Sequence, residues 1–571
     1  MLKSVSFAIL LMALTKTASA QQASAPSDAQ RIADEATETA RAGKFDEALR
    51  LYKRALDFAP GDMSILRDYA VVLGWAEKYS DAIPVIRKVL LAQSEQPDWA
   101  LREFARSLLF GDATEEALQR LNQLVERGDF SEGTLARRAL AFRWLGRDNE
   151  ASIAYADIRK RYPQSAAAFA GLAYVSADRG RLPEALEILD SAPASMQSQP
   201  DLVVARIQIL NWMGRHYEAQ RLIADLPGSL AANRDILQES VLAERWGGNP
   251  SAAMRELVRL ESLYPDQRSR DLLRELRTEY GHALTPLFRY SKDSDGLVDR
   301  TVGLDAAFHI NPSHVIRTGY QYRWMQQNPQ EGRTLVRYDL GWSGSLNRHL
   351  ASYATVSNID YRMSGLPRKV VGDGALRFTP NDTVRVEGGG GVIAMDAFQS
   401  LVNQVTASFG FGDLGLNFGA NRIDVRYSGY SFSDDVIRHR INGQYARSLM
   451  EESAIRLSAG FRASMMTHSA STPDFYSPAR LHTYLGFAQF SGRPTTWMDY
   501  YGEVGAGWQV ETGTQLMHPF QIGGGVGWHP NRHIRLSVDA GKSTSSMDRV
   551  GPGLRTYSRW SAGGGLEIRF P

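Results

Sequence analysis

The stretch IRTGYQYRW at residues 316–324 decides the fold of the C-terminal half, because its side chains alternate in character with a period of two. Its isoleucine, tyrosines and tryptophan fall on one face, while its glycine, glutamine and arginines fall on the other. Residues 336–342, VRYDLGW, alternate in the same way, as do the segments at 534–541 and 559–570. This alternation predicts strands with one apolar and one polar face.

Together these segments predict an antiparallel transmembrane β-barrel of about sixteen strands over residues 284–571. Apolar side chains would face lipid and polar ones an aqueous lumen, because sixteen strands enclose more space than their side chains fill. A soluble β-sandwich has the same alternation. Aromatic residues at strand ends, and an apolar last strand ending in Arg569-Phe570-Pro571, favour the membrane.

Short turns are predicted between each even-numbered strand and the next odd-numbered strand. The other connections are mostly longer, with the longest near 464–480 and 543–556. Outer-membrane barrels have short periplasmic turns, so an even strand number places both barrel ends, and the domain before them, in the periplasm. The predicted short turns are Asn311-Pro312-Ser313, Leu346-Asn347-Arg348, Pro380-Asn381-Asp382, Gly412-Asp413, Met450-Glu451-Glu452, Gly492-Arg493-Pro494 and Pro530-Asn531-Arg532.

A repeat of 34 residues, the tetratricopeptide period, fills the first half. The small residue that opens the second helix of each hairpin recurs at Ala48, Ala82, Ala117, Ala151, Ala185, Ala219 and Ala253. Five residues before five of these alanines, at the turn between the helices, stand Gly43, Gly146, Gly180, Gly214 and Gly248. The second helix is predicted to end before Pro60, Pro163 and Pro265.

The segment GKFDEALRLYKRALDFAP at 43–60 resembles the tetratricopeptide consensus almost position for position. We therefore predict an all-α tetratricopeptide solenoid of about seven repeats over residues 30–266, between linkers at 21–29 and 267–283. Each hairpin buries its apolar face only against a neighbour, and the stacked array has a concave face suited to peptides or extended ligands.

The N-terminus has the features of a secretory signal peptide over residues 1–20. Lys3 supplies a positive charge, Val5–Leu14 form an apolar run, and Ala18-Ser19-Ala20 form a small-residue cleavage site. The apolar run is too short for a membrane-spanning helix.

Composition argues against several classes of function. The chain has no cysteine, which excludes disulfides, thiolate metal sites and cysteine nucleophiles. A net charge of +2 gives no sign of a nucleic-acid partner. Residues 410–415, GFGDLG, formally match a dinucleotide fingerprint, but their strand-like flanks predict a hairpin turn. His529 and His533 are four residues apart, but Pro530 between them predicts a turn rather than a helical metal site. We predict no enzyme activity, catalytic residue, cofactor or metal.

The predicted lumen is the most informative surface. From residue 285 onward the chain has 26 arginines and three lysines. Guanidinium groups bind carboxylates and phosphates with two hydrogen bonds. These residues either line a path for a hydrophilic polymer or brace the wall through cross-strand ion pairs. The predicted pore-lining residues are Arg317, Gln321, Arg323, Arg337, Asp339, Arg385, Glu387, Arg438, Arg440, Arg456, Arg462, Glu503, Arg535, Asp539, Arg559, Glu567 and Arg569.

A secreted tetratricopeptide array followed by a sixteen-strand barrel resembles the exopolysaccharide export porins of Gram-negative bacteria, in particular the poly-N-acetylglucosamine export porins. The resemblance implies an outer-membrane barrel that passes a biofilm-type exopolysaccharide from the periplasm to the cell surface. It also implies a periplasmic repeat domain that recruits the polymer, a polysaccharide-modifying enzyme or another periplasmic protein. Outer-membrane lipid and the barrel assembly machinery are the other expected partners.

The alternative is a surface receptor or structural protein, such as a phage or adhesion receptor, whose outer loops bind other particles and whose barrel transports no polymer.

Overall fold

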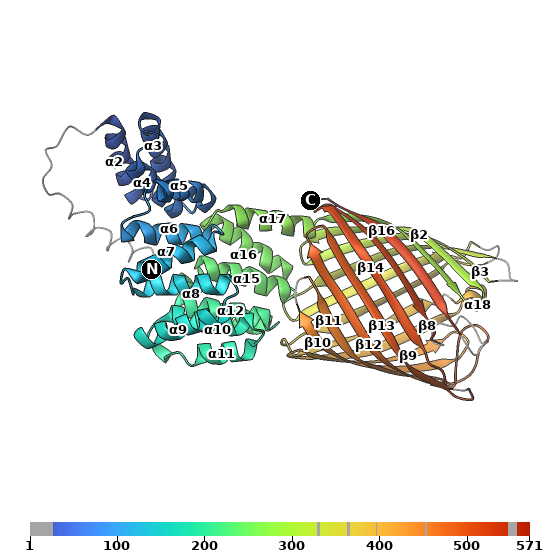
Figure 1. Ribbon diagram of the computed structural model, residues 1–571. Helices are drawn as coiled ribbons and strands as arrows, with labels where there is room; N and C mark the ends of the chain where they lie inside the picture. Colours follow the sequence, from blue (N-terminus) through green and yellow to red (C-terminus); the bar gives the residue numbers. More distant parts are fainter. Residues whose placement is uncertain are drawn as a thin grey trace. The chain divides into compact units, whose positions relative to one another are not determined.

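The computed structural model describes residues 27–327, 332–362, 366–395, 397–451, 454–514, 516–545 and 557–570. The predicted signal peptide and most of the connection near 543–556 lie outside these residues. The chain divides into two compact units, residues 1–205 and 206–571. The first is helical, and the second holds further helices and a barrel (Figure 1).

The helices come in antiparallel pairs, which confirms the tetratricopeptide solenoid. They are α2 (Asp28–Arg41), α3 (Phe45–Phe58), α4 (Met63–Trp75), α5 (Tyr79–Ala92), α6 (Asp98–Phe110), α7 (Thr114–Glu126), α8 (Glu132–Trp144), α9 (Asp148–Arg161), α10 (Ala166–Asp178), α11 (Leu182–Asp190), α12 (Pro200–Trp212), α13 (His216–Ala224), α14 (Gly228–Ala231), α15 (Arg234–Trp246), α16 (Pro250–Leu263) and α17 (Gln267–Glu279), with a 3₁₀ turn η1 at Ala194–Met196.

The repeating alanine lies where the two helices of a pair cross. All seven of these alanines are fully buried, because a larger side chain would hold the helices apart. The five repeating glycines have φ angles between 68° and 78°, and Glu77 and Asp112 have positive φ in the two repeats without that glycine. The turn therefore needs a left-handed residue, which glycine adopts at least cost.

Asp129, between α7 and α8, links neighbouring repeats. Its carboxylate accepts hydrogen bonds from the backbone N–H of Ser131 (3.1 Å), the hydroxyl of Thr134 (2.8 Å) and the guanidinium of Arg102 (2.9 Å). Burial raises the pKa of Asp129, but these hydrogen bonds outweigh it and lower the pKa to about 2. The ionised carboxylate therefore stabilises the fold.

The segment expected as a linker at 267–283 is structured. Residues Gln267–Glu279 form α17, whose first turn is capped by Asp266. The first strand begins at His282 rather than Leu284. The prediction of a linker was wrong. Asp266, directly after Pro265, caps the N-terminus of a new helix, so α17 begins where the linker was expected.

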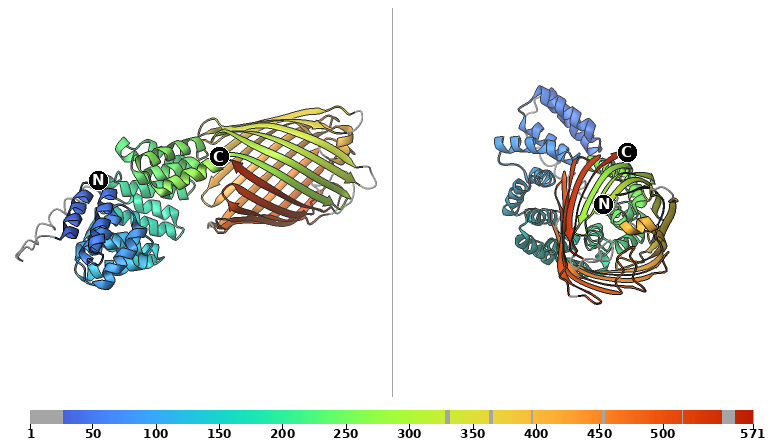
Figure 2. Two further views of the ribbon diagram at one scale, coloured as in Figure 1. Left: turned by 90° about the horizontal axis from the view of Figure 1, so that it is seen from above. Right: turned by 90° about the vertical axis from the view of Figure 1, so that its right-hand side faces the viewer.

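The C-terminal half is a closed antiparallel barrel of sixteen strands within the described residues, as predicted. The strands are β1 (His282–Asp293), β2 (Leu297–Asn311), β3 (His314–Gln327), β4 (Arg333–Ser345), β5 (Leu350–Asp360), β6 (Lys369–Phe378), β7 (Val384–Ala394), β8 (Thr406–Phe418), β9 (Asn421–Phe432), β10 (Ile437–Glu451), β11 (Arg456–His468), β12 (Arg480–Thr495), β13 (Met498–Glu511), β14 (Phe520–Asn531), β15 (Ile534–Ser543) and β16 (Arg559–Phe570). Each strand pairs with its sequence neighbours, and β1 pairs with β16 to close the ring, seen nearly end-on in Figure 2.

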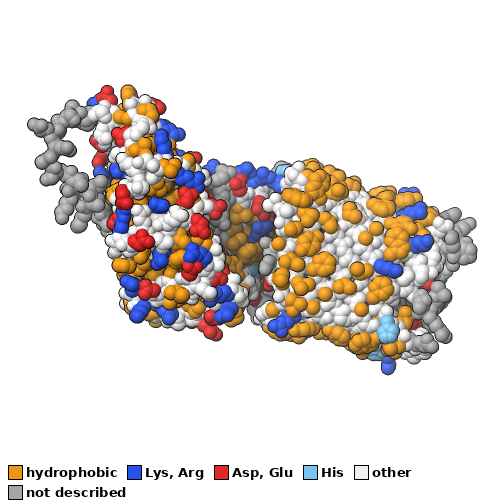
Figure 3. Space-filling model, in the orientation of Figure 1, with side chains coloured by type: hydrophobic (Ala, Val, Ile, Leu, Met, Phe, Trp, Pro, Cys, Tyr) orange, Lys and Arg blue, Asp and Glu red, His pale blue; other side chains and the backbone are white. Residues whose placement is uncertain are grey.

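The outer wall of the barrel is apolar. Large side chains such as Leu340 (60 % exposed), Val356 (54 %) and Val538 (59 %) point outward, and hydrophobic groups cover the visible wall in Figure 3. In water so large an exposed apolar surface would cause aggregation, whereas in lipid it is favourable. Among the described residues, no helix is long and apolar enough to cross a membrane.

Two predicted turns were misplaced. Gly412-Asp413 lies inside β8, and the real turn follows Phe418. Residues 492–494 lie inside β12, whose pairing with β13 shifts register between Gly492 and Thr495. Glycine and proline in these places mark a strand interior and an irregularity rather than chain reversal.

Candidate functional site: the barrel lumen

The predicted pore-lining residues lie on β3, β4, β7, β10, β11, β13, β15 and β16. In each strand they occupy the positions that alternate with the outward apolar ones. In β4, for example, Arg337 and Asp339 alternate with the outward Tyr338 and Leu340, which are 48 % and 60 % exposed. The strand register thus places these polar groups on the inner face.

Many inner arginines are paired with carboxylates. The guanidinium of Arg323 lies 2.6 Å from the carboxylate of Asp299 on the adjacent strand, and both side chains are largely buried. Arg385 bridges Asp413 (2.8 Å) and Asp424 (2.9 Å). Further pairs are Arg337–Asp339, Arg377–Glu387, Arg462–Glu503, Arg535–Asp499, Arg559–Asp299 and Arg569–Glu567. Arg337–Asp339 and Arg569–Glu567 each lie within one strand, and the other pairs join different strands and hold the wall in one register.

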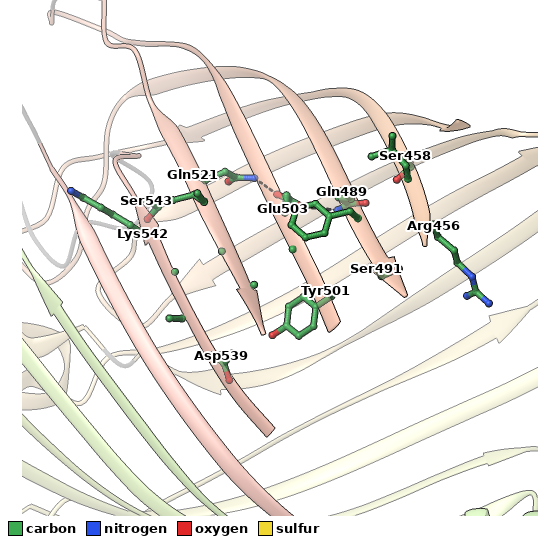
Figure 4. Close-up of a pocket in the computed structure, with 18 of the residues that line it drawn as sticks. Arg456, Ser458, Gln489, Ser491, Tyr501, Glu503, Gln521, Asp539, Lys542 and Ser543 are labelled. Carbon is green, nitrogen blue, oxygen red and sulfur yellow. Dashed lines mark hydrogen bonds between the residues drawn. The ribbon is translucent and has the colours of Figure 1, made fainter. Parts of the chain in front are cut away.

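Glu503 on β13 is the centre of one polar network. It accepts hydrogen bonds from Arg462 (3.1 Å) and from the amides of Gln489 and Gln521. These residues come from four strands, β11 to β14. Figure 4 shows Glu503 with Gln489 and Gln521 on the inner wall. A carboxylate that accepts hydrogen bonds from three side chains is fixed in position, so Glu503 cross-links the strands of the wall.

A hollow of about 860 Å³ runs along this part of the inner wall. Arg456 and Asp539 line it together with Tyr501, whose side chain projects into it (Figure 4). The floor is nearly flat because Gly523 and Gly541 carry no side chain. The lining therefore has both charge signs and one exposed aromatic ring.

Sequence reasoning missed several acidic partners, namely Asp299, Asp413, Asp424 and Asp499. In their pairs with Arg323, Arg385 and Arg535, the two partners lie 24 to 39 residues apart in the sequence and on different strands. The strand register brings these residues together. A correct register would have predicted the pairs.

At the end of the barrel with the longer connections, loops fold against the inner wall. The short helix α18 (Phe398–Asn403) packs Phe398 and Leu401 against inward-facing residues of β2 to β6. The hydroxyl of Ser400 donates to the carbonyl of Asp474 (2.7 Å), and the amide of Asn403 donates to its carboxylate (2.6 Å). These hydrogen bonds join the connection between β7 and β8 to the connection between β11 and β12. Together the two connections narrow the lumen at this end.

At the opposite end, the short turns contact the last helices. The carboxylate of Asp382, in the β6–β7 turn, accepts hydrogen bonds from the backbone N–H groups of Tyr217 (2.9 Å) and Glu218 (3.3 Å), at the start of α13. The ring of Tyr217 stacks on that of His349, with centroids 5.1 Å apart. Burial at this contact raises the pKa of Tyr217.

Two further contacts involve α16 and α17. The hydroxyl of Ser345 donates to the carbonyl of Gly248 (3.1 Å), just before α16. The guanidinium of Arg569 donates to the carbonyl of Glu279 (3.1 Å), at the end of α17. The helices from α13 onward are therefore bound to the short-turn end of the barrel at several points.

One family model and several solved structures are similar to parts of this chain. Residues 40–101 match the tetratricopeptide repeat family. A solved structure described as a bacterial polysaccharide outer membrane secretin is 12 % identical, with a TM-score of 0.44, covering 51 % of this chain and 99 % of that one. A tetratricopeptide repeat protein from Parabacteroides merdae is 17 % identical, with a TM-score of 0.36, covering 43 % and 97 %. YrrB, a tetratricopeptide repeat protein with an unusual peptide-binding site, is 22 % identical, with a TM-score of 0.27, covering 31 % and 89 %. No curated protein matches the chain.

Proposed function

We propose that this protein is an outer-membrane porin that exports an exopolysaccharide, as the poly-N-acetylglucosamine export porins do, and that its repeat domain lies in the periplasm. One observation carries the proposal. A sixteen-strand barrel with a charged inner wall has helical repeats bound to the rim of its short-turn end. A barrel of this size leaves room for a hydrated path.

The repeats act as a receiving surface in this proposal. A tetratricopeptide array offers a concave face for a partner protein or an extended ligand. The helices that touch the rim would hold that partner, such as a polysaccharide-modifying enzyme, or the polymer itself, next to the entrance. The barrel then conducts the polymer outward, and no catalytic step of its own is required.

The test asks whether polymer secretion requires the repeats in addition to the pore. A variant that lacks residues 30–205 removes most of the first unit and keeps α13–α17 on the barrel. In cells that secrete the polymer, we expect this variant to insert into the outer membrane, to conduct ions, and to secrete no polymer. Undiminished secretion would contradict the coupling between repeats and pore.

A surface receptor is the second candidate, favoured by α18 and the 469–479 connection, which narrow the lumen. Conductance of the purified full chain in a planar bilayer distinguishes the two. A large conductance that a polysaccharide blocks supports export, and a closed barrel supports the receptor.

A further inference from the structure

A row of aromatic rings lies on the inner wall at β8 and β9. Phe411 and Phe409 stack with centroids 6.3 Å apart, Phe409 and Tyr430 with 5.6 Å, Tyr430 and Phe432 with 6.2 Å, and Phe432 and Phe475 with 4.4 Å. The planes of successive rings differ by 9° to 27°. The row runs along the wall until it reaches the 469–479 connection, so it follows the direction of transport.

These rings share a face with the ion pairs of the lumen. Phe409 and Phe411 alternate with Gly410 and Gly412, and they have the same parity as Asp413, which pairs with Arg385 inside the barrel. Phe411, Phe432 and Phe475 are buried, whereas Phe409 and Tyr430 are only half-buried. The middle of the row is therefore the accessible part.

The wall beside the rings is bare. In β7, Gly389 and Gly391 pair with Phe411 and Phe409 and carry no side chain. β7 therefore places no side chain directly opposite Phe409 and Phe411. Glycine is needed at positions 389 and 391 because a Cβ would lie 2.3 Å from the carbonyl oxygen of Gly374 and 2.1 Å from that of Gly372, respectively.

Two arginines lie against the row of rings, Arg426 at an exposed position and Arg438 at a half-buried one. The guanidinium carbon of Arg426 lies 3.9 Å from the ring centre of Phe411. That of Arg438 lies 5.6 Å from Tyr430 and 4.8 Å from Phe432, and its Nε donates to His468 (2.7 Å). Within the described part of the chain, neither guanidinium forms an ion pair with a carboxylate, unlike the bracing arginines.

This combination fits a charged sugar chain. The C–H face of a pyranose ring packs on an aromatic ring, and stacked rings in series accept successive sugars without fixing any one. An unpaired guanidinium binds a carboxylate or another acidic oxygen group with two hydrogen bonds. A cationic polymer would be repelled by both arginines.

Resting on the proposed function, we propose that Phe409 and Tyr430, flanked by Arg426 and Arg438, form a sliding track for an anionic polysaccharide. The polymer lies with its sugar faces on the two rings and its acidic groups on the arginines. Aromatic stacking does not depend on which sugar of the polymer lies on which ring, so the polymer can advance by one sugar at a time.

The experiment measures block of single-channel current by oligosaccharides, with the full chain in a planar bilayer. The probes are an oligogalacturonate and an uncharged malto-oligosaccharide of the same length. We expect the oligogalacturonate to block more tightly, and the difference to shrink at high salt. The double variant Phe409→Leu, Tyr430→Leu should weaken its block about tenfold.

The control is Tyr427→Leu, an aromatic on the same strand that points outward and is 47 % exposed. It should leave the block unchanged. Arg426→Gln, at an exposed position, should reduce the preference for the oligogalacturonate over the uncharged sugar.

The outcomes separate the track from the pore. A conducting barrel whose block does not depend on Phe409 and Tyr430 overturns the track and leaves export intact. Equal block by both probes overturns the assignment to an anionic polymer. A barrel that conducts nothing overturns the proposed function itself.

Discussion

Replacing Asp382 by alanine should loosen the contact between the helices and the barrel rim. Its carboxylate is the partner of two backbone N–H groups at the start of α13, which have no partner in their own helix. Loss of an N-terminal capping residue costs about 1–2 kcal/mol, with a further contribution from the helix dipole. This corresponds to an increase of about 5- to 30-fold in local opening.

Hydrogen exchange of the peptide that covers α13, measured on the full chain in detergent, detects this change. The matched control is Asp62→Ala, because Asp62 accepts from the backbone N–H groups of Ser64 (2.9 Å) and Ile65 (3.1 Å) in its own helix α4. The control should speed exchange in α4 and leave α13 unchanged. Exchange in α13 that changes less than twofold in Asp382→Ala would refute the capping across the rim.

Three other changes test the solenoid and the lumen. Asp129→Asn should lower the free energy of unfolding of the first unit by up to about 2 kcal/mol at neutral pH. Because the folded pKa of Asp129, about 2, lies below the ordinary value of 3.8, the difference from wild type should disappear as pH falls through that range; denaturant titrations at several pH values check it. Gly171→Ala should destabilise the same unit by about 1–3 kcal/mol, since a Cβ there would lie 2.2 Å from the ring of Tyr155, and thermal unfolding would report the loss. Glu503→Gln removes the carboxylate that faces Arg462, so the pore should become more selective for anions, seen as a shift of the reversal potential in a salt gradient.

The sequence predicts the barrel and the solenoid because each fold repeats a simple pattern many times. Alternation with a period of two appears in strand after strand, and the buried alanine recurs in seven hairpins. A single misplaced turn, such as Gly412-Asp413, does not change the strand total, because the real turn lies a few residues further on.

Residues 408–412, SFGFG, show where pattern reasoning failed. We expected phenylalanine to face outward and polar residues inward, but here the glycines face outward and Phe409 and Phe411 face the lumen. Because of the glycines at 410 and 412, we predicted a turn at Gly412-Asp413, which lies inside β8. The rule that apolar residues face lipid does not hold where the lumen itself uses aromatic rings.

The ion pairs of the wall could not be predicted for a different reason. Most of these pairs link residues on different strands, and a shift of one residue in register would break them. Arg323 and Asp299 show this: their strands were visible in the sequence, but not their pairing.

The seam between β1 and β16, where His282 lies opposite Phe570, has a consequence for biogenesis. The two ends of the barrel meet only after the last residues have been synthesised, whereas every hairpin of the solenoid closes between near neighbours. Contacts of short sequence separation form quickly and distant ones slowly. The helical repeats should thus mature first, and a nascent barrel with two unpaired edges is the stage at which chaperones are needed.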